Sequence, residues 1–188
     1  MGKYSVEETG IDGLKVITPL LNEDDRGYFY ESYNKRDFEA LGINMEFVQD
    51  NEAKSVKNVL RGLHFQINHP QTKLVRCTKG KVFDVAVDLR KGSKTFGKYY
   101  GVELSSENKK MFLIPKNFAH GYYVMSDEAV FCYKVDDFYH PNDEGGIIWN
   151  DKKIGVKWPI SGSDIDKIIF SDKDTKWEGL DAWESKYL

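Results

Sequence analysis

The chain has 188 residues, of which 40% are hydrophobic and 30% are charged, a balance typical of a single globular domain. The net charge of -3 gives no support to nucleic-acid binding, and no apolar run approaches the roughly 20 residues of a membrane helix. The N-terminus lacks an apolar signal segment. Cys77 and Cys132 stand in separate apolar runs without a CxxC partner, which favours reduced thiols in a cytoplasmic protein.

Short strand-like segments dominate the chain from its start. Alternation at 14–18 and an aromatic run at 27–33 predict strands, and Asn34 and Gly42 delimit a short predicted helix between them. Many short strands separated by Gly, Asn, Asp and Ser clusters, with little helix, predict an antiparallel barrel or sandwich. The further predicted strands are 74–78, 81–90, 97–104, 110–114, 121–125, 129–135 and 146–149, with a helical turn near 173–180.

The stretch 58–66 carries the strongest chemical signal, because Arg61, His64 and Gln66 interrupt an apolar run. Burying such groups without partners is costly, so they predict a polar cavity inside a β-structure. Arg can bind a phosphate, and His can move a proton near neutral pH. In an ideal strand Arg61 and His64 would face opposite sides, so a shared site requires a bulge or bend, which we expect at Gly62.

The segment 81–90 alternates between an apolar face and a face that carries Asp84 and Asp88. Among the other histidines, His120 is as consistent with a structural role as with a functional one. No HxH or HxxH pair occurs, which argues against a cupin-type metal centre. Taken singly, the remaining candidates read as turn, surface or packing residues: Arg26, Glu31, Gln49, Asp50, Asn51, Lys73, Tyr133, Tyr139 and Asp174.

Together, these segments follow the order and spacing of one family. The chain resembles the dTDP-4-dehydrorhamnose 3,5-epimerases of dTDP-L-rhamnose synthesis over nearly its whole length. It departs from the common pattern after Asp174, where 175–180 replace small residues and a proline, so the shape of the lid of the site stays open. The matching segments are 25–27 with Glu31, 47–51, 60–66, 73–75, 83–90, 93–97, 118–121, Tyr133, 149–151 and 171–174.

The resemblance implies an all-β, cupin-like jelly roll (a double-stranded β-helix) with a few short helices. It implies a single domain over 1–188 with a core at about 45–150, on which the N-terminal strands and the C-terminal segment pack. The expected assembly is a cytoplasmic homodimer that needs no metal or other cofactor and has no nucleic-acid or membrane partner.

The implied enzyme is an isomerase that acts on a dTDP-linked 4-keto-6-deoxyhexose. The ketone acidifies the C–H bonds at C3 and C5, so inversion needs a base, an enolate stabiliser and an acid on the opposite face. By resemblance, His64 is the base, Asp174 orients it, Lys73 faces the ketone oxygen, and Tyr133 returns the proton.

The resemblance also implies the residues that bind the nucleotide. Arg26 and Arg61 would hold the diphosphate, and Tyr139 would stack on thymine. In a homodimer, the N-terminal segment is the part expected to reach the partner's site. Glu31, Gln49, Asp50 and Asn51 would bond to thymine or sugar hydroxyls, and the remaining substrate contacts would be His120, Glu144 and Lys173.

Three alternatives remain open at the level of sequence. A relative that inverts only C3 or C5, or that accepts another nucleotide-linked 4-keto sugar, would keep His64, Lys73 and Tyr133. A non-catalytic sugar-nucleotide-binding cupin would explain the arginines but not the four catalytic candidates together. A metal-dependent cupin oxygenase would require metal in the purified protein.

Overall fold

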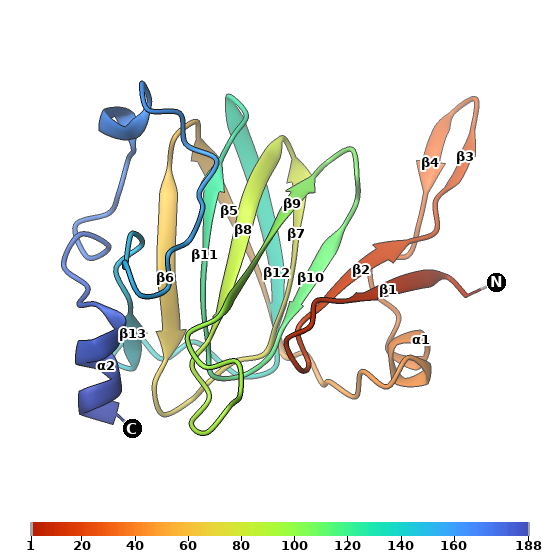
Figure 1. Cartoon of the computed structure of the whole chain (residues 1–188). Helices are drawn as coiled ribbons and strands as arrows, with labels where there is room; N and C mark the ends of the chain where they lie inside the picture. The colour runs from red at the N-terminus through yellow and green to blue at the C-terminus, as the bar shows by residue number, and fades with distance from the viewer. Residues whose placement is uncertain (1, 188) are drawn as a thin grey trace.

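A computed structural model describes residues 2–187 of the chain. Two antiparallel sheets lie face to face, with a hairpin projecting at the N-terminal side and a helix at the C-terminal side (Figure 1). No helix within this range is long and apolar enough to cross a membrane.

Successive strands change sheets, which is the jelly-roll arrangement expected from the resemblance. From β5 to β8, and again from β9 to β13, each strand lies in the sheet opposite to its predecessor's. The cupin-like, double-stranded β-helix is therefore confirmed. The first sheet has the order β1 (Tyr4–Glu8), β2 (Lys15–Pro19), β10 (Met111–Ile114), β7 (Lys73–Lys79), β12 (Glu128–Val135) and β5 (Gln49–Val56). The second sheet has the order β13 (Glu144–Gly146), β6 (Leu60–Gln66), β11 (Phe118–Val124), β8 (Lys81–Asp88) and β9 (Tyr99–Ser105).

The remaining elements lie around these sheets. β3 (Asn22–Asp24) and β4 (Gly27–Phe29) form the projecting hairpin (Figure 1). The predicted helix is confirmed as α1 (Lys35–Ala40), and Gly42, just beyond its C-cap, has a positive φ of 77°. Asn34 occupies the N-cap position of α1 but makes no capping hydrogen bond with its side chain, whose amide donates to Glu31. The chain closes with a 3₁₀ turn η1 (Ile165–Lys167), a turn at 172–175 and α2 (Leu180–Tyr187).

The two faces of β8 belong to different apolar clusters. Its predicted apolar face, with Val85 and Val87, packs outside the second sheet against Ile147 and α2. Its opposite face, with Ala86, belongs to the core between the two sheets. The carboxylate face of this strand therefore looks into the barrel, where water is scarce and partners are required.

β6 contains the irregularity predicted at Gly62. His64 is opposite His120 and Arg61 is opposite Tyr122, so β6 has one residue more than β11 between the two pairs. Gly62 has a φ of 116°, and a Cβ there would lie 2.6 Å from the Gly121 Cα. Only glycine fits this close approach, and the resulting bulge brings Arg61 and His64 to the same cavity.

Candidate active site

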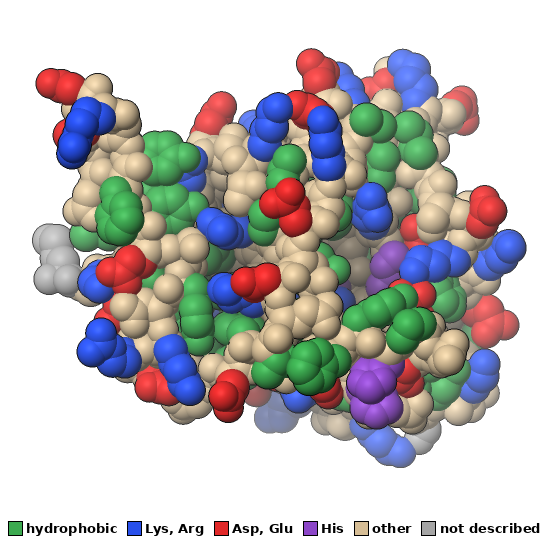
Figure 2. Space-filling model, turned by 180° about the vertical axis from the view of Figure 1, so that it is seen from behind, with side chains coloured by type: hydrophobic (Ala, Val, Ile, Leu, Met, Phe, Trp, Pro, Cys, Tyr) green, Lys and Arg blue, Asp and Glu red, His purple; other side chains and the backbone are tan. Residues whose placement is uncertain are grey.

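A cavity of about 620 Å³ lies between the two sheets and opens beside the C-terminal segment 169–174. The space-filling view shows a hollow bordered by histidine, basic and apolar side chains on the right half of the face (Figure 2). The predicted site residues that line the cavity are Gln49, Asn51, Arg61, His64, Lys73, His120, Tyr133, Tyr139, Glu144, Lys173 and Asp174.

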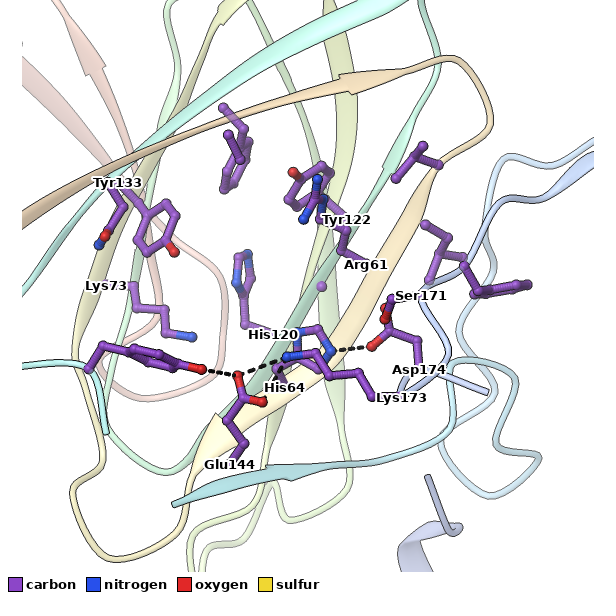
Figure 3. Close-up of a pocket in the computed structure, with 18 of the residues that line it drawn as sticks. Arg61, His64, Lys73, His120, Tyr122, Tyr133, Glu144, Ser171, Lys173 and Asp174 are labelled. Carbon is purple, nitrogen blue, oxygen red and sulfur yellow. Dashed lines mark hydrogen bonds and ion pairs between the residues drawn. The ribbon is translucent and has the colours of Figure 1, made fainter. Parts of the chain in front are cut away.

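One wall of the cavity carries a histidine–carboxylate pair. Nε2 of His64, on β6, contacts Oδ1 of Asp174, and the Ser171 hydroxyl donates to Oδ2 at 2.8 Å (Figure 3). Asp174 is only 1% exposed. Burial acts to raise the pKa of Asp174, but the hydrogen bond and charge of His64, with Ser171 and the Trp177 indole, outweigh it and lower that pKa. The carboxylate thus stays ionised beside His64, whose Nδ1 is left for a substrate.

Lys73 and Tyr133 lie across the cavity from this pair (Figure 3). Lys73, on β7, lines the cavity, where its side chain is partly accessible to water but its ammonium is buried among protein atoms. This burial lowers the pKa of Lys73 to about 8, although the charges of Asp84 and Glu144 act to raise it. Burial likewise raises the pKa of Tyr133, which keeps its phenol protonated. The two groups can therefore present an ammonium and an O–H to a bound molecule.

Asp84 is a site residue that the sequence reasoning did not single out. It is fully buried on β8, and both carboxylate oxygens lie 3.0 Å from Nε2 of His120. Burial raises the pKa of Asp84, against the opposing effects of His120 and Lys73. The alternation of residues 81–90 was the signal in the sequence that could have identified Asp84. It places a carboxylate on one face of β8, and the structure buries both faces of this strand.

Replacement of this carboxylate should change how Lys73 titrates. We expect Asp84→Asn to lower the pKa of Lys73 further, because the variant removes a negative charge that favours the ammonium form. If catalysis needs the Lys73 ammonium, the pH at which the rate falls on the alkaline side should therefore be lower in the variant. Glu52→Gln, on an exposed position of β5, is the control. An alkaline limb that stays in place in Asp84→Asn would contradict this coupling.

Three predicted substrate-binding residues connect across the mouth of the cavity. The Glu144 carboxylate accepts hydrogen bonds from the Tyr139 hydroxyl at 3.1 Å and from the Lys173 ammonium at 2.7 Å (Figure 3). These side chains come from the β12–β13 loop, from β13 and from the turn at 172–175. The network therefore ties the C-terminal segment to the barrel next to His64.

The guanidinium of Arg61 is positioned by a hydrogen bond from its Nε atom. Its Nε donates to the Ser55 hydroxyl at 3.2 Å, and Ser55 lies 3.4 Å from the Tyr122 hydroxyl. Contact through Nε leaves the terminal nitrogens of the guanidinium for an anion, and the planar fork suits two phosphate oxygens. Ser55 and Tyr122 are further residues that the sequence reasoning did not identify, since neither type is distinctive in a strand.

Three predicted binding residues do not line the cavity of this single chain. Arg26 lies in the β3–β4 hairpin, with its side chain 89% exposed and paired with Asp24. Glu31 accepts hydrogen bonds from Lys3 and Asn34. Asp50 pairs with Lys134 on the outer face of the first sheet, because its neighbour Asn51 points inward and side chains alternate along β5.

The two antiparallel sheets with a polar cavity between them define a cupin-like jelly-roll protein. The model of the dTDP-4-dehydrorhamnose 3,5-epimerase family matches residues 8–182. The chain belongs to this family.

Individual relatives agree with the family model. A dTDP-4-dehydrorhamnose 3,5-epimerase of Methanothermobacter thermautotrophicus is 48% identical over 180 residues, which cover 96% of each chain. The solved structure of a dTDP-4-dehydrorhamnose 3,5-epimerase from Elizabethkingia anophelis has 47% identity and a TM-score of 0.90, covering 99% of this chain and 100% of that one. A dTDP-6-deoxy-D-glucose-3,5-epimerase from Legionella pneumophila, solved in complex with dTDP-4-keto-L-rhamnose, has 47% identity and a TM-score of 0.92, covering 98% and 97%.

Proposed function

We propose that the protein epimerises dTDP-4-dehydro-6-deoxy-D-glucose at C3 and C5 to give dTDP-4-dehydro-L-rhamnose. The observation that carries the proposal is the placement of a His64–Asp174 pair on one wall of a cavity and of Lys73 and Tyr133 on the other. Proton removal from one face of a sugar ring and proton delivery to the other is what inversion next to a ketone requires.

At each carbon the reaction has two proton transfers. His64 takes the proton of the C–H bond through its free ring nitrogen. The electron pair of that bond forms a double bond to C4, and the carbonyl electron pair moves onto the C4 oxygen to give an enolate. The Lys73 ammonium stabilises the negative charge on the C4 oxygen, and the Asp174 carboxylate stabilises the imidazolium. Tyr133 then donates its phenol proton to the opposite face of the carbon. One C–H bond breaks and one forms, so the reaction has no net redox change.

The nucleotide part of the substrate extends from the cavity toward its mouth. Arg61 binds the diphosphate through its terminal nitrogens, and Lys173 adds a second positive charge there when it leaves Glu144. Tyr139 is 50% exposed and offers its ring to thymine, while Gln49 and Asn51 offer amides to thymine or the sugar.

We further propose that the protein is a cytoplasmic homodimer whose N-terminal hairpins contribute to binding. Arg26 and Glu31 lie away from the cavity of their own chain, so any contact with substrate requires a second copy. The same hairpin exposes Phe29 by 68% and Tyr28 by 55%, which is apolar surface that a second copy would cover.

Incubation with the dTDP-4-keto sugar in deuterated water tests the proposed reaction. We expect deuterium at both C3 and C5 of the product, detected by NMR and mass spectrometry. Deuterium at a single carbon would instead identify a single-carbon epimerase, and binding without exchange would identify a non-catalytic binding module. Elemental analysis of the same preparation tests the metal-dependent alternative.

A further inference from the structure

Trp177 lies beside the proposed base, in the part of the sequence that departs from the family pattern. It follows Asp174 by three residues, and its ring meets the His64 ring edge-on, with centroids 6.3 Å apart and planes at 70°. The segment that carries it is fixed to the barrel immediately afterwards, where the Ile148 amide donates to the Glu178 carbonyl at 3.0 Å. The indole is thus held in place by the backbone next to it.

Gly146 provides the seat for this indole. Gly146 is the register partner of His64 on the neighbouring strand β13. A Cβ at Gly146 would lie 2.4 to 2.6 Å from three atoms of the Trp177 ring, so the ring occupies the space that the missing side chain leaves. The packing of Trp177 therefore depends on a backbone position directly beside His64.

The polar edge of the indole is buried beside Gly146. Nε1 of Trp177 is buried and has no partner of standard hydrogen-bond geometry within residues 2–187. The Trp177 N–H also acts on Asp174. Burial acts to raise the pKa of Asp174, and His64, Ser171 and this N–H together lower that pKa. Two independent features, the ring contact with His64 and the packing on Gly146 beside His64, thus connect Trp177 with the His64–Asp174 pair.

We propose that Trp177 is a positioning residue for the His64–Asp174 pair, whose ring, packed on Gly146, holds the turn bearing Asp174 against His64. The neighbouring residues Lys173, Thr175 and Lys176 are exposed, and Lys173 ties the turn to Glu144 by an ion pair only, so Trp177 supplies the apolar contact beside Asp174. The inference rests on the proposed role of His64 as the base. A small misplacement of a catalytic group is enough to lower a rate by about 100-fold.

Substitutions at Trp177 separate positioning from general stability. We expect Trp177→Ala to lower kcat by about 10- to 100-fold with a smaller change in KM, because Asp174 no longer holds His64 in place while Arg61 and the other nucleotide contacts outside the turn remain. Trp177→Phe keeps the ring on Gly146 and should retain most of the activity. Trp177→Leu takes the place of the alanine variant if the latter does not fold.

Trp183 offers a matched control. Its Nε1 is also buried without a partner in the described part of the chain, but its ring packs on Phe65 and Phe96 instead of on the site. Trp183→Ala should lower the melting temperature while leaving kcat unchanged. Equal kcat values for the folded Trp177→Ala and Trp183→Ala variants would overturn the proposal.

Gly146→Ala tests the seat itself. The added methyl group displaces the indole, so it should lower kcat in the wild-type background. In the Trp177→Ala background the methyl group has room, and its effect on kcat should largely disappear. Additive effects of the two substitutions would contradict the proposal.

A spectroscopic measurement separates this proposal from the proposed function. A histidine that donates to a carboxylate gives a downfield proton resonance, which NMR detects without any substrate. We expect this resonance of His64 in the wild type and in Trp177→Phe, and its loss in Trp177→Ala. A resonance that persists in Trp177→Ala would refute positioning by Trp177, even if the wild type proved inactive on the sugar nucleotide.

Discussion

His64→Gln, whose amide nitrogen takes the place of Nε2, should lower the rate of deuterium exchange by about 100- to 10,000-fold, the usual contribution of a positioned general base. The amide cannot accept a proton from carbon, whereas it can still donate a hydrogen bond to Asp174. That partner matters because Asp174 is buried, and the loss of one of its two donors, with Ser171 remaining, would destabilise the fold. We therefore expect His64→Ala to lose stability as well as turnover, and His64→Gln to lose mainly turnover.

The binding of dTDP, measured by calorimetry, should change little in His64→Gln, because the proposed diphosphate contacts are those of Arg61 and Lys173. His69→Asn is a matched control: His69 also hydrogen-bonds a carboxylate, that of Asp143 at 3.1 Å, but it stacks on His140 outside the cavity lining. The control should keep its activity. Exchange that remains within about 10-fold of the wild-type rate in His64→Gln would rule out His64 as the base.

The bulge at Gly62 was predictable because its cause is local. The alternation of side chains along a strand puts Arg61 and His64 on opposite faces, so a shared cavity demands one extra residue between them. The structure has that extra residue on β6, and the close contact between Gly62 and Gly121 explains why a glycine stands there.

The polar strand β5 was not predicted because its sequence lacks the usual signal. Its residues read as a turn-forming cluster followed by charged residues, although Asn51 and Ala53 line the cavity and Asp50 and Glu52 face outward. A strand that borders a polar cavity has polar side chains on both faces, so no hydrophobic alternation marks it. The orientation of Asp50 could not be predicted for the same reason. Because β5 was not recognised as a strand, the sequence did not show that Asp50 faces away from the cavity.

The partners of the buried charges depend on contacts between distant parts of the chain. Asp174 meets His64 across 110 residues, and Asp84 meets His120 across 36. Residue spacing alone cannot indicate such pairs. The resemblance to a family supplied the first pair, and the second became evident only when the charged face of β8 was found inside the barrel.

Lys73→Met should remove an important catalytic group and make the protein more stable. Loss of the ammonium opposite the ketone oxygen should lower kcat by about 100- to 1,000-fold, as removal of one oxyanion donor does elsewhere. Burial lowers the pKa of Lys73 from 10.5 to about 8, so the folded state bears the cost of a partly desolvated charge. That difference corresponds to roughly 3 kcal/mol, which the apolar methionine would not incur.

The sign of the pH dependence follows from the same shift. Below about pH 8 the lysine is protonated in both states, so the wild type bears the full cost there. Between about pH 8 and 10.5 the folded protein has released the proton while the unfolded chain still holds it, so wild-type stability rises with pH and the advantage of Lys73→Met fades. Activity should follow the opposite course, because the ammonium that stabilises the enolate is lost as pH rises through about 8.

Denaturant unfolding at about pH 7 and about pH 10, together with a rate profile, measures both effects. Lys79→Met is the matched control, since Lys79 lies on the same strand but is 63% exposed and forms only a surface ion pair with Glu128. It should leave turnover unchanged and bring no gain in stability, because exposed pairs contribute about 0–1 kcal/mol. If Lys73→Met were less stable than the wild type at about pH 7, burial of the ammonium could not be the cause of its lowered pKa, and the alkaline limb of activity would need another titrating group.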